Sequence, residues 1–551
     1  MMNMLICSMI FFLLSMMFLI MSLNMMMLNK ILIMEWLIFK INSMKFNFFI
    51  MLDDMSLIFM FLIMMISSMV MIYSINYMNL NEIMIKRFFY LLMLFVLSMC
   101  FMIMSPNMLT IILGWDGLGL ISYCLIIYYQ NNKSYNSGML TMMLNRIGDM
   151  SLLMLISIMM MFNSWNFMIY NNNNMMIMLL LIMMAFTKSA QLPFSSWLPA
   201  AMMAPTPISS LVHSSTLVTA GIYLLIRYEN FIMNYKIYIL LISSFTMLMS
   251  GLIANYEIDF KKIIALSTLS QLGFMMSILS LGFTELTFFH LIIHALFKSL
   301  MFLCVGSFIF YNNGSQDLRD YSGMFYIYPF KSLILMFTLM SLSGFPFLVG
   351  FYSKDLIMEQ FFYSKMNMIS LMNLFMSTLF TISYSMRLIL IVLMNNNMKF
   401  FMNFIKEDLY MNMCMLFMMI ISIFFSKIYL NLKFNMIILE LHYIYKMMML
   451  KLYILGIIMG YQFYYKFYMN NLIGMFMKNM MYLNNFYSII YLKPIKFILI
   501  YEMMFEKFYL QNMLMDKMII FMNIMKMKLF NIQLYLMMYM YMYMYMILLM
   551  F

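Results

Sequence analysis

Long apolar runs recur along almost the whole chain and are separated by short polar breaks. Runs of about 20 residues, among them Met4–Leu23, Met55–Tyr73 and Met108–Tyr128, are long enough to cross a hydrocarbon core of roughly 30 Å as an α-helix. The alternating strands of about ten residues that mark an outer-membrane barrel are not visible, and a helical bundle satisfies every backbone group inside a membrane. The pattern predicts an all-α polytopic membrane protein with about 15–16 transmembrane helices.

Five regions differ in how polar residues interrupt the apolar runs. Residues 1–86 are expected to hold N-terminal transmembrane helices around a less regular segment, and residues 87–397 a closely packed core that contains most of the glycines, prolines and histidines. Additional transmembrane helices are expected at 398–469. Over 470–527 a charge follows every few positions, which is typical of a lateral amphipathic helix on a membrane or protein surface. Residues 528–551 are expected to form a C-terminal transmembrane helix.

Composition narrows the class of protein. Of 551 residues, 66% are hydrophobic and 9% are charged, so no soluble domain of normal size fits between the expected helices. The 90 methionines, together with abundant Asn, Ile, Phe, Tyr and Lys, indicate an A/T-rich, insect-like mitochondrial genome. The run Met4–Leu23 lacks a basic leader and a small-residue cleavage site, so it is expected to be a retained first helix.

Charge and cysteine usage exclude other classes of protein. The formal net charge of +12 is spread thinly, without a dense block of Lys and Arg. Nucleic-acid binding is therefore not expected, and anionic lipid such as cardiolipin is the expected partner of these charges. The five cysteines are widely spaced and include no C-x-x-C pair, which supports neither a disulfide framework nor an iron–sulfur site.

Two ionisable residues inside apolar runs indicate the chemistry, because a charge at the bilayer centre costs on the order of 3 kcal/mol. Asp116 lies in the glycine-rich stretch Leu113–Gly119, where small residues let helices approach closely. Lys188 lies before Pro193, and burial would make its charge depend on a nearby carboxylate such as Asp116. We interpret the two as a proton switch; the structural alternatives are a helix-junction Asp and a static or interfacial Lys.

The histidines extend this series. His213 lies in a hydroxyl-rich stretch after Pro207, where it either helps to hold a file of water or is a satisfied core residue. His290, His294 and Lys298 are four residues apart, which places them near one helical face, about 6 Å from one another. We predict that they form one hydrated relay. A zinc site is the alternative, but the intervening residues lack a Glu and no third ligand is evident.

Proline-broken runs frame the candidate site. Pro193–Pro207 and Pro329–Pro346 each follow an apolar run and lie near a Lys, which suggests two related halves with broken helices. Lys354 and Asp355 follow the second break and close the series of buried charges.

Other charged residues are expected to be structural. Arg146 and Asp149 are three residues apart, which favours a supporting ion pair on one helical face. The polar stretches Tyr256–Lys262 and Gly314–Asp320 are expected to anchor loops.

The motifs of residues 50–395 resemble those of the chain 5 family of mitochondrial NADH:ubiquinone oxidoreductase, respiratory complex I. The resemblance is carried by Phe186–Gln191, Trp197–Met202, Ala204–Ser209, His213–Gly221, Asp259–Gly273 and Gly350–Asp355. It implies a core of two inverted five-helix antiporter-like repeats. It also implies that Lys188 is the partner of Asp116, that His213, His290, His294 and Lys298 continue a hydrophilic axis, and that Lys354 lies near its distal outlet.

Two positions depart from the family pattern. Asp116 takes the place of the family's usual Glu and is one methylene shorter, which changes its reach toward Lys188. Ser195 occupies a place where some relatives carry a His.

The resemblance implies a proton-translocating membrane-arm subunit of NADH:ubiquinone reductase that assembles with neighbouring antiporter-like chains. The sequence has no G-x-G-x-x-G fingerprint and no cluster ligands, so NADH, FMN, iron–sulfur clusters and ubiquinone are expected on partner subunits, with no cofactor or metal on this chain. The alternative is a subunit of a stand-alone Na⁺/H⁺ antiporter, which the stretch 470–527 argues against because such an arm suits a large complex. An intramembrane hydrolase would need a nucleophile–base or metal constellation that is not visible.

Overall fold

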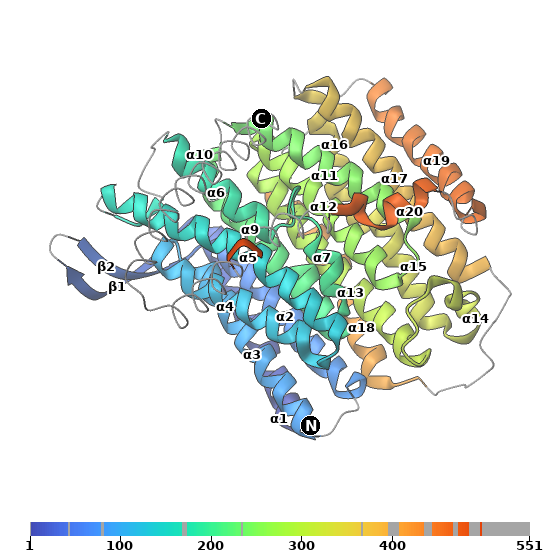
Figure 1. The fold of residues 1–551 in the computed structure, drawn as a ribbon, viewed down its shortest axis with the longest axis horizontal. Coiled ribbons are helices and arrows are strands. Elements are labelled where there is room, and N and C mark those ends of the chain that lie inside the picture. Colours follow the sequence, from blue (N-terminus) through green and yellow to red (C-terminus); the bar gives the residue numbers. More distant parts are fainter. Residues whose placement is uncertain are drawn as a thin grey trace, which may run out of the picture. The chain divides into compact units, whose positions relative to one another are not determined.

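The structure is a computed structural model that describes residues 2–41, 44–78, 82–162, 164–167, 174–232, 235–364, 367–394, 407–434, 443–466, 472–483 and 496–498. Within these residues, twelve helices are long and apolar enough to cross a membrane, and two shorter apolar helices accompany them. The predicted all-α polytopic membrane architecture is confirmed (Figure 1). The expected total of about 15–16 helices includes stretches that lie outside the described residues.

The bounds of the helices follow the apolar runs. The first are α1 (Met2–Leu28), α2 (Asp54–Tyr77), α3 (Glu82–Met104), α4 (Met108–Ile126) and α5 (Asn132–Met159). The middle of the chain forms α6 (Met175–Lys188), α7 (Trp197–Ala200), α8 (Thr206–Ile208), α9 (Leu217–Arg227), α10 (Glu229–Ile232), α11 (Lys236–Tyr256), α12 (Phe260–Leu281) and α13 (Thr284–Tyr311). The last are α14 (Met324–Ile327), α15 (Pro329–Ser343), α16 (Val349–Tyr363), α17 (Met368–Met394), α18 (Leu409–Phe434), α19 (Tyr443–Lys466) and α20 (Leu472–Lys478).

The core lies around three membrane segments. The most apolar windows of α12, of α13 and of the segment Thr206–Arg227 are buried throughout, and α2 is nearly as enclosed. The windows of α1 and α19 are mostly exposed, and since these helices are apolar they suit contact with lipid. Polar side chains on α12 and α13 are therefore surrounded by protein.

Two helices end partway through the bundle, as the proline-marked runs predicted. α6 has 14 residues and ends at Lys188, and non-helical backbone leads from there to α7. α15 has 15 residues and ends at Ser343, and α16 begins at Val349. A helix break inside a membrane protein frees backbone groups that need polar partners, and these are tolerated where protein surrounds them.

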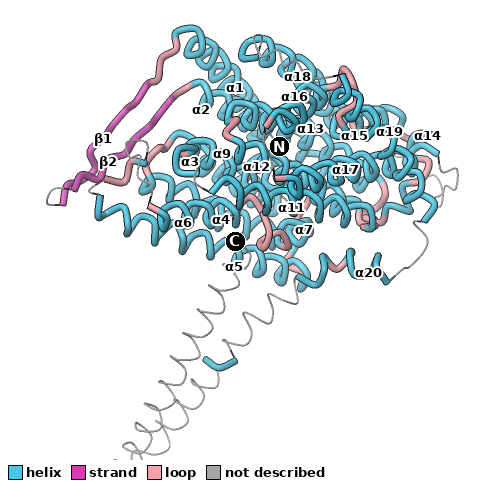
Figure 2. Tube along the Cα trace, turned by 90° about the horizontal axis from the view of Figure 1, so that it is seen from above, coloured by secondary structure: helices cyan, strands magenta, loops and turns pink. Residues whose placement is uncertain are grey.

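A two-stranded antiparallel sheet interrupts the helices near the N-terminus. β1 (Leu32–Ile41) pairs with β2 (Met44–Leu52), and both extend away from the helices (Figure 2). The side-chain amide of Asn47 donates a hydrogen bond to Glu35 across the strands. The sequence pattern indicated only a less regular segment here, because the apolar residues are not confined to alternate positions.

The C-terminal regions fall largely outside the described residues. The chain divides into two compact units, Met1–Lys478 and Asn479–Phe551. Of the predicted lateral helix at 470–527, the structure describes α20 and residues 479–483 and 496–498, and the predicted last helix at 528–551 lies wholly outside. Both stay predictions.

Candidate functional site: a buried series of ionisable side chains

Lys188 is the last residue of α6 and is fully buried. Its ammonium donates to the backbone carbonyl of Trp115 at 3.3 Å and lies 4.8 Å from the centre of the Trp115 ring. Its charge interacts with Asp149 and, more weakly, with Asp116. In this part of the described chain, the predicted coupling of Lys188 and Asp116 therefore has no direct ion pair, and the amine lies over Trp115 instead.

Asp149 joins this group through two contacts. Its carboxylate pairs with Arg146 at 3.1 Å and accepts a hydrogen bond from the indole of Trp115 at 2.9 Å. The predicted Arg146–Asp149 ion pair is present in the structure. The charge of Asp149 acts on Lys188 more strongly than that of Asp116 does, and Trp115 contacts both Asp149 and Lys188. Asp149 is therefore a second counter-ion beside the predicted Asp116.

The unwound chain after α6 is tied back to the helix end. The indole of Trp197 donates to the carbonyl of Thr187 at 2.9 Å, which satisfies one of the carbonyls that the break frees. An added Cβ on Gly221 would lie 2.5 Å from the Ala185 carbonyl oxygen, so α9 approaches α6 closely. These contacts fix Lys188 beside the segment that carries His213.

His213 lies in a π-helix, Ser209–Thr216, that precedes α9. The His213 ring is buried, and among the described residues neither of its nitrogens has a hydrogen-bond partner. Its ring centre lies 6.3 Å from that of Trp197 in an edge-on arrangement. The π-helix packs against α13. Single π-helical turns are rare and occur frequently at functional sites.

The three predicted relay residues of α13 point into protein and not toward lipid. His290, His294 and Lys298 are all buried. His290 contacts Ser353 of α16 at 2.8 Å and Gln271 of α12 at 3.2 Å. Both partners are neutral polar groups. Because they belong to α16 and α12, His290 links these two helices to α13.

The other two relay residues have different surroundings. Lys298 donates to the hydroxyl of Ser267 of α12. His294 is buried, and neither of its ring nitrogens has a hydrogen-bond partner among the described residues. A buried polar group without a protein partner is often served by water. The single-face placement predicted from the spacing holds, and the water stays a prediction.

Lys354 lies beside the second helix break. Its ammonium donates to the freed carbonyl of Leu342 at 2.8 Å and to the hydroxyl of Thr381 at 3.3 Å. Its charge acts on both His290 and Lys298. The structure thus brings the three residues into one electrostatic group. Asp355 is half-buried and also has an interaction partner.

Two further buried lysines lie outside the series that the sequence predicted. Lys261, predicted to lie in a loop, is in α12 and donates to the carbonyl of Ala204 at 3.3 Å. Lys331 of α15 lies 3.7 Å from the ring centre of Tyr311. The signal for Lys261 was its place before a long apolar run, and for Lys331 its place two residues after Pro329 at a helix start.

The described residues contain no group of three or more His, Cys, Asp or Glu side chains that could hold a metal ion. What the site does contain is a series of amines, imidazoles and carboxylates, with hydroxyls between them. Such groups can hold and exchange protons, particularly through water. Lys188 forms one cluster with Asp149 and Arg146, and Lys298, His290 and Lys354 form a second.

Two family models match the chain. The family model described as "NADH:quinone oxidoreductase/Mrp antiporter, TM" matches residues 105–381, and the model described as "NADH-Ubiquinone oxidoreductase (complex I), chain 5 N-terminus" matches residues 36–89. Together they cover the first helix break, the π-helix and the second break.

Relatives from several animals match over much of the chain. The NADH-ubiquinone oxidoreductase chain 5 of Apis mellifera ligustica is 53% identical over 438 residues, which are 79% of this chain and 78% of the bee protein. The chain 5 of Locusta migratoria is 54% identical over 361 residues, 64% of this chain and 63% of the locust protein.

Solved structures share the fold. An Mrp complex from Dietzia sp. DQ12-45-1b is similar with a TM-score of 0.69 and 22% identity, covering 81% of this chain and 53% of that chain. An archaeal membrane-bound sulfane sulfur reductase is similar with a TM-score of 0.65 and 17% identity, covering 84% of this chain and 97% of that chain. From the family models and the relatives together, the chain belongs to the chain 5 family of NADH-ubiquinone oxidoreductase.

Proposed function

We propose that this chain is a proton-translocating membrane-arm subunit of NADH:ubiquinone oxidoreductase. It is a multi-pass protein of the mitochondrial inner membrane. It couples electron transfer from NADH to quinone, which takes place on partner subunits, to movement of protons through the buried Lys and His series. The observation that carries the proposal is the pair of buried lysines at the two helix breaks, Lys188 and Lys354, in a chain of this family.

The Lys188 cluster can act as an electrostatic switch. A buried amine keeps its charge only where neighbours stabilise it, and here the neighbours are the carboxylates of Asp149 and Asp116 and the face of Trp115. Asp149 is shared with Arg146, so a shift of Asp149 toward either cation changes the charge that Lys188 experiences. A movement of this kind would load or release the Lys188 proton.

The second cluster can pass a proton onward. Ser353 connects the His290 ring to the helix that carries Lys354, and Ser267 connects Lys298 to α12. Hydroxyls and imidazoles both donate and accept, so they support transfer in either direction. The gaps around His294 need water, since its ring nitrogens have no protein partner among the described residues. Each proton moved against the membrane potential requires about 2.3 kcal/mol per 100 mV.

The electron-transfer chemistry belongs to other subunits under this proposal. NADH, FMN, the iron–sulfur clusters and ubiquinone bind to partner chains, and this chain holds no cofactor. Its partners are the other membrane-arm subunits, especially neighbouring antiporter-like chains, and lipids such as cardiolipin. Coupling is therefore conformational and electrostatic.

A subunit of a stand-alone Na⁺/H⁺ antiporter is the alternative, and the likeness to an Mrp complex shows that the fold is shared. The match of residues 36–89 to the chain 5 N-terminus favours the respiratory complex.

The test is the replacement Lys188→Met in the assembled complex. Methionine fills a similar volume but carries no proton, so we expect the number of protons moved per NADH to fall strongly while the complex still assembles. The measurement is the proton gradient formed by sealed vesicles during NADH–quinone turnover, compared with assembly on a native gel.

Lys133→Met is the matched control, because Lys133 is an exposed residue of α5 and the chemical change is the same. The control should pump as the unaltered complex does. Normal pumping by an assembled Lys188→Met complex, or a native complex that contains this chain but lacks NADH–quinone activity, would remove the proposed function.

A further inference from the structure

The π-helix that carries His213 continues into α9, and polar residues follow one face of α9 as far as its last residue, Arg227. Thr219, Tyr223 and Arg227 follow one another at intervals of four, which places them on one face of α9. Thr219 and Tyr223 are fully buried, and the side chain of Arg227 is 9% exposed. Polar groups therefore continue from the π-helix of His213 toward the end of the bundle at Arg227.

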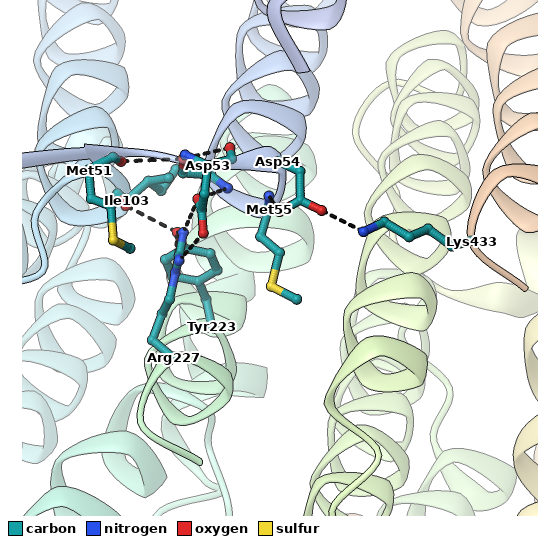
Figure 3. A network of polar contacts seen from close by, with 9 residues as sticks. Met51, Asp53, Asp54, Met55, Ile103, Tyr223, Arg227 and Lys433 are labelled. Carbon is teal, nitrogen blue, oxygen red and sulfur yellow. Dashed lines mark hydrogen bonds and ion pairs between the residues drawn. The ribbon is translucent and has the colours of Figure 1, made fainter. Parts of the chain in front are cut away.

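A bidentate ion pair between Arg227 and Asp53 lies at the Arg227 end of this face. Nη2 of Arg227 donates to Oδ1 of Asp53 at 2.7 Å, and Nη1 donates to Oδ2 (Figure 3). The Asp53 side chain is 11% exposed and also accepts a hydrogen bond from the backbone N–H of Ser56 at 2.9 Å, which caps the start of α2. Such a pair fixes orientation as well as charge.

Tyr223 hydrogen-bonds to the same guanidinium. Nε and Nη2 of Arg227 donate to its hydroxyl at 3.0 and 2.7 Å, and that hydroxyl donates to the carbonyl of Ile103 at the end of α3 at 3.1 Å (Figure 3). Phe59 of α2 stacks on the Tyr223 ring with centres 5.1 Å apart. The pair therefore joins α2, α3 and α9 at one point.

A small cavity lies directly against this pair. Its lining includes Tyr223, Arg227, Met51 and Ser105. The Ser105 hydroxyl is buried, and no residue of the described chain hydrogen-bonds to it. A polar site of this kind suits a water molecule. Polar groups therefore lie next to the ion pair both along α9, at Thr219, and in the cavity that Arg227 and Tyr223 line.

Neither charge of the pair can pass a proton on. A guanidinium cannot be deprotonated in a protein, and its positive charge repels protons. Burial raises the pKa of Asp53, but the hydrogen bonds and charge of Arg227 and the hydrogen bonds from Ser56 outweigh it and hold that pKa below the usual value. The stabilisation from this carboxylate is present above the ordinary Asp pKa and is lost only as pH falls through the lowered value, so the pair is intact at neutral pH.

We propose that Asp53, Arg227 and Tyr223 form a proton barrier that closes one end of the polar face leading to His213. The inference rests on the proposed function, since a barrier matters only in a chain that moves protons. It assigns the ion pair a role in preventing back-flow, and the loss of the pair uncouples proton movement from turnover without removing the transfer groups themselves.

Asp54, the residue after Asp53, supplies a matched control because it also forms an ion pair. Asp54 pairs with Lys433 of α18 at 2.6 Å, with side chains 25% and 27% exposed (Figure 3). This pair also joins two helices at the same end of α2. It contacts neither Arg227 nor Tyr223 in the network that Figure 3 draws, so it does not cover the polar face.

The test compares Asp53→Asn with Asp54→Asn in the complete complex, reconstituted in sealed vesicles. Without NADH, a pH difference is imposed and its decay is followed. We expect Asp53→Asn to raise the passive proton conductance at least about twofold over Asp54→Asn, because an uncharged amide frees the guanidinium to move away. With NADH, the quinone reduction rate should be retained while the gradient is smaller.

Equal passive proton conductance of the assembled Asp53→Asn and Asp54→Asn complexes would contradict the proposed barrier. If Asp53→Asn does not assemble, Arg227→Lys decides the question, since a lysine keeps the positive charge but makes one contact in place of two and can lose its proton. A conductance above that of Asp54→Asn supports the barrier, and one equal to it overturns the inference. Failure of the proposed function is a separate result, because it shows as an unaltered complex that forms no gradient with NADH.

Discussion

At the scale of single residues, the three buried lysines of the series make their direct contacts with neutral groups. Lys188 rests on Trp115, Lys298 on Ser267, and Lys354 on a carbonyl that the second helix break exposes. Neutral partners stabilise an ammonium less than a carboxylate does, so each of these charges responds strongly to any ion that approaches. That sensitivity suits groups that gain and lose protons, whereas the barrier at Asp53 and Arg227 uses a full ion pair.

His294 and Leu291 provide a test at this scale, because both are fully buried in α13. His294→Ala should reduce the protons moved per NADH more than Leu291→Ala does. The leucine change costs about 2–5 kcal/mol in lost packing, but it removes no transfer group. Vesicle pumping assays, normalised to assembled complex, give the comparison. If the two variants pumped equally, His294 would be only a packing residue.

At the scale of elements, the two broken helices place a lysine where backbone groups are free. α6 ends at Lys188 itself, and the break between α15 and α16 receives the Lys354 ammonium. The breaks therefore do more than interrupt a membrane span, since they place free backbone groups next to buried lysines of the series. The π-helix before α9 is a third irregular segment, and it carries His213.

At Gly350, the backbone of α16 lies in very close contact with the end of α15. An added Cβ there would lie 1.8 Å from the carbonyl oxygen of Ser341, so Gly350→Ala must push α16 away from α15. We expect a loss of stability of about 1–3 kcal/mol or more, seen as reduced assembly and a lower midpoint of thermal unfolding.

The control is Gly314→Ala. An added Cβ at Gly314 meets nothing within 4 Å, and only the positive φ of 83° is strained. Its cost should be about 1 kcal/mol. Stability of Gly350→Ala equal to or above that of this control would contradict the close approach of the two half-helices.

At the scale of the whole molecule, the ionisable series depends on helices from distant parts of the chain. α5 and α6 carry the cluster around Lys188, and α12, α13 and α16 carry the cluster around His290. α2 pairs with α9 through Asp53 and with α18 through Asp54. Apolar outer helices such as α1 leave these polar groups away from lipid.

The predicted lateral helix at 470–527 belongs to this scale. Shortening it should reduce the amount of intact complex, because an amphipathic arm along the membrane surface would hold neighbouring subunits together. Native gels with in-gel NADH oxidation measure the loss, and the comparison is between a deletion of 24 residues within 470–527 and removal of residues 528–551, which are also 24. Full assembly after the deletion within 470–527 would rule out this clamping role.

The sequence by itself determined the helical membrane class, the two breaks and the series from Lys188 to Lys354. These features depend on local facts: apolar run length, proline positions and the four-residue repeat of a helix face. The candidate residues of α13 are all turned inward, as the spacing predicted.

Only the tertiary structure decided which groups meet. Sequence order made Asp116 the expected neighbour of Lys188, but helix packing places Trp115 against the amine and brings in Asp149 from α5. Asp53 and Arg227 are separated by 174 positions and still form a two-pronged pair. A partner across a helix interface depends on the rotation and depth of both helices, which the pattern along one of them does not specify.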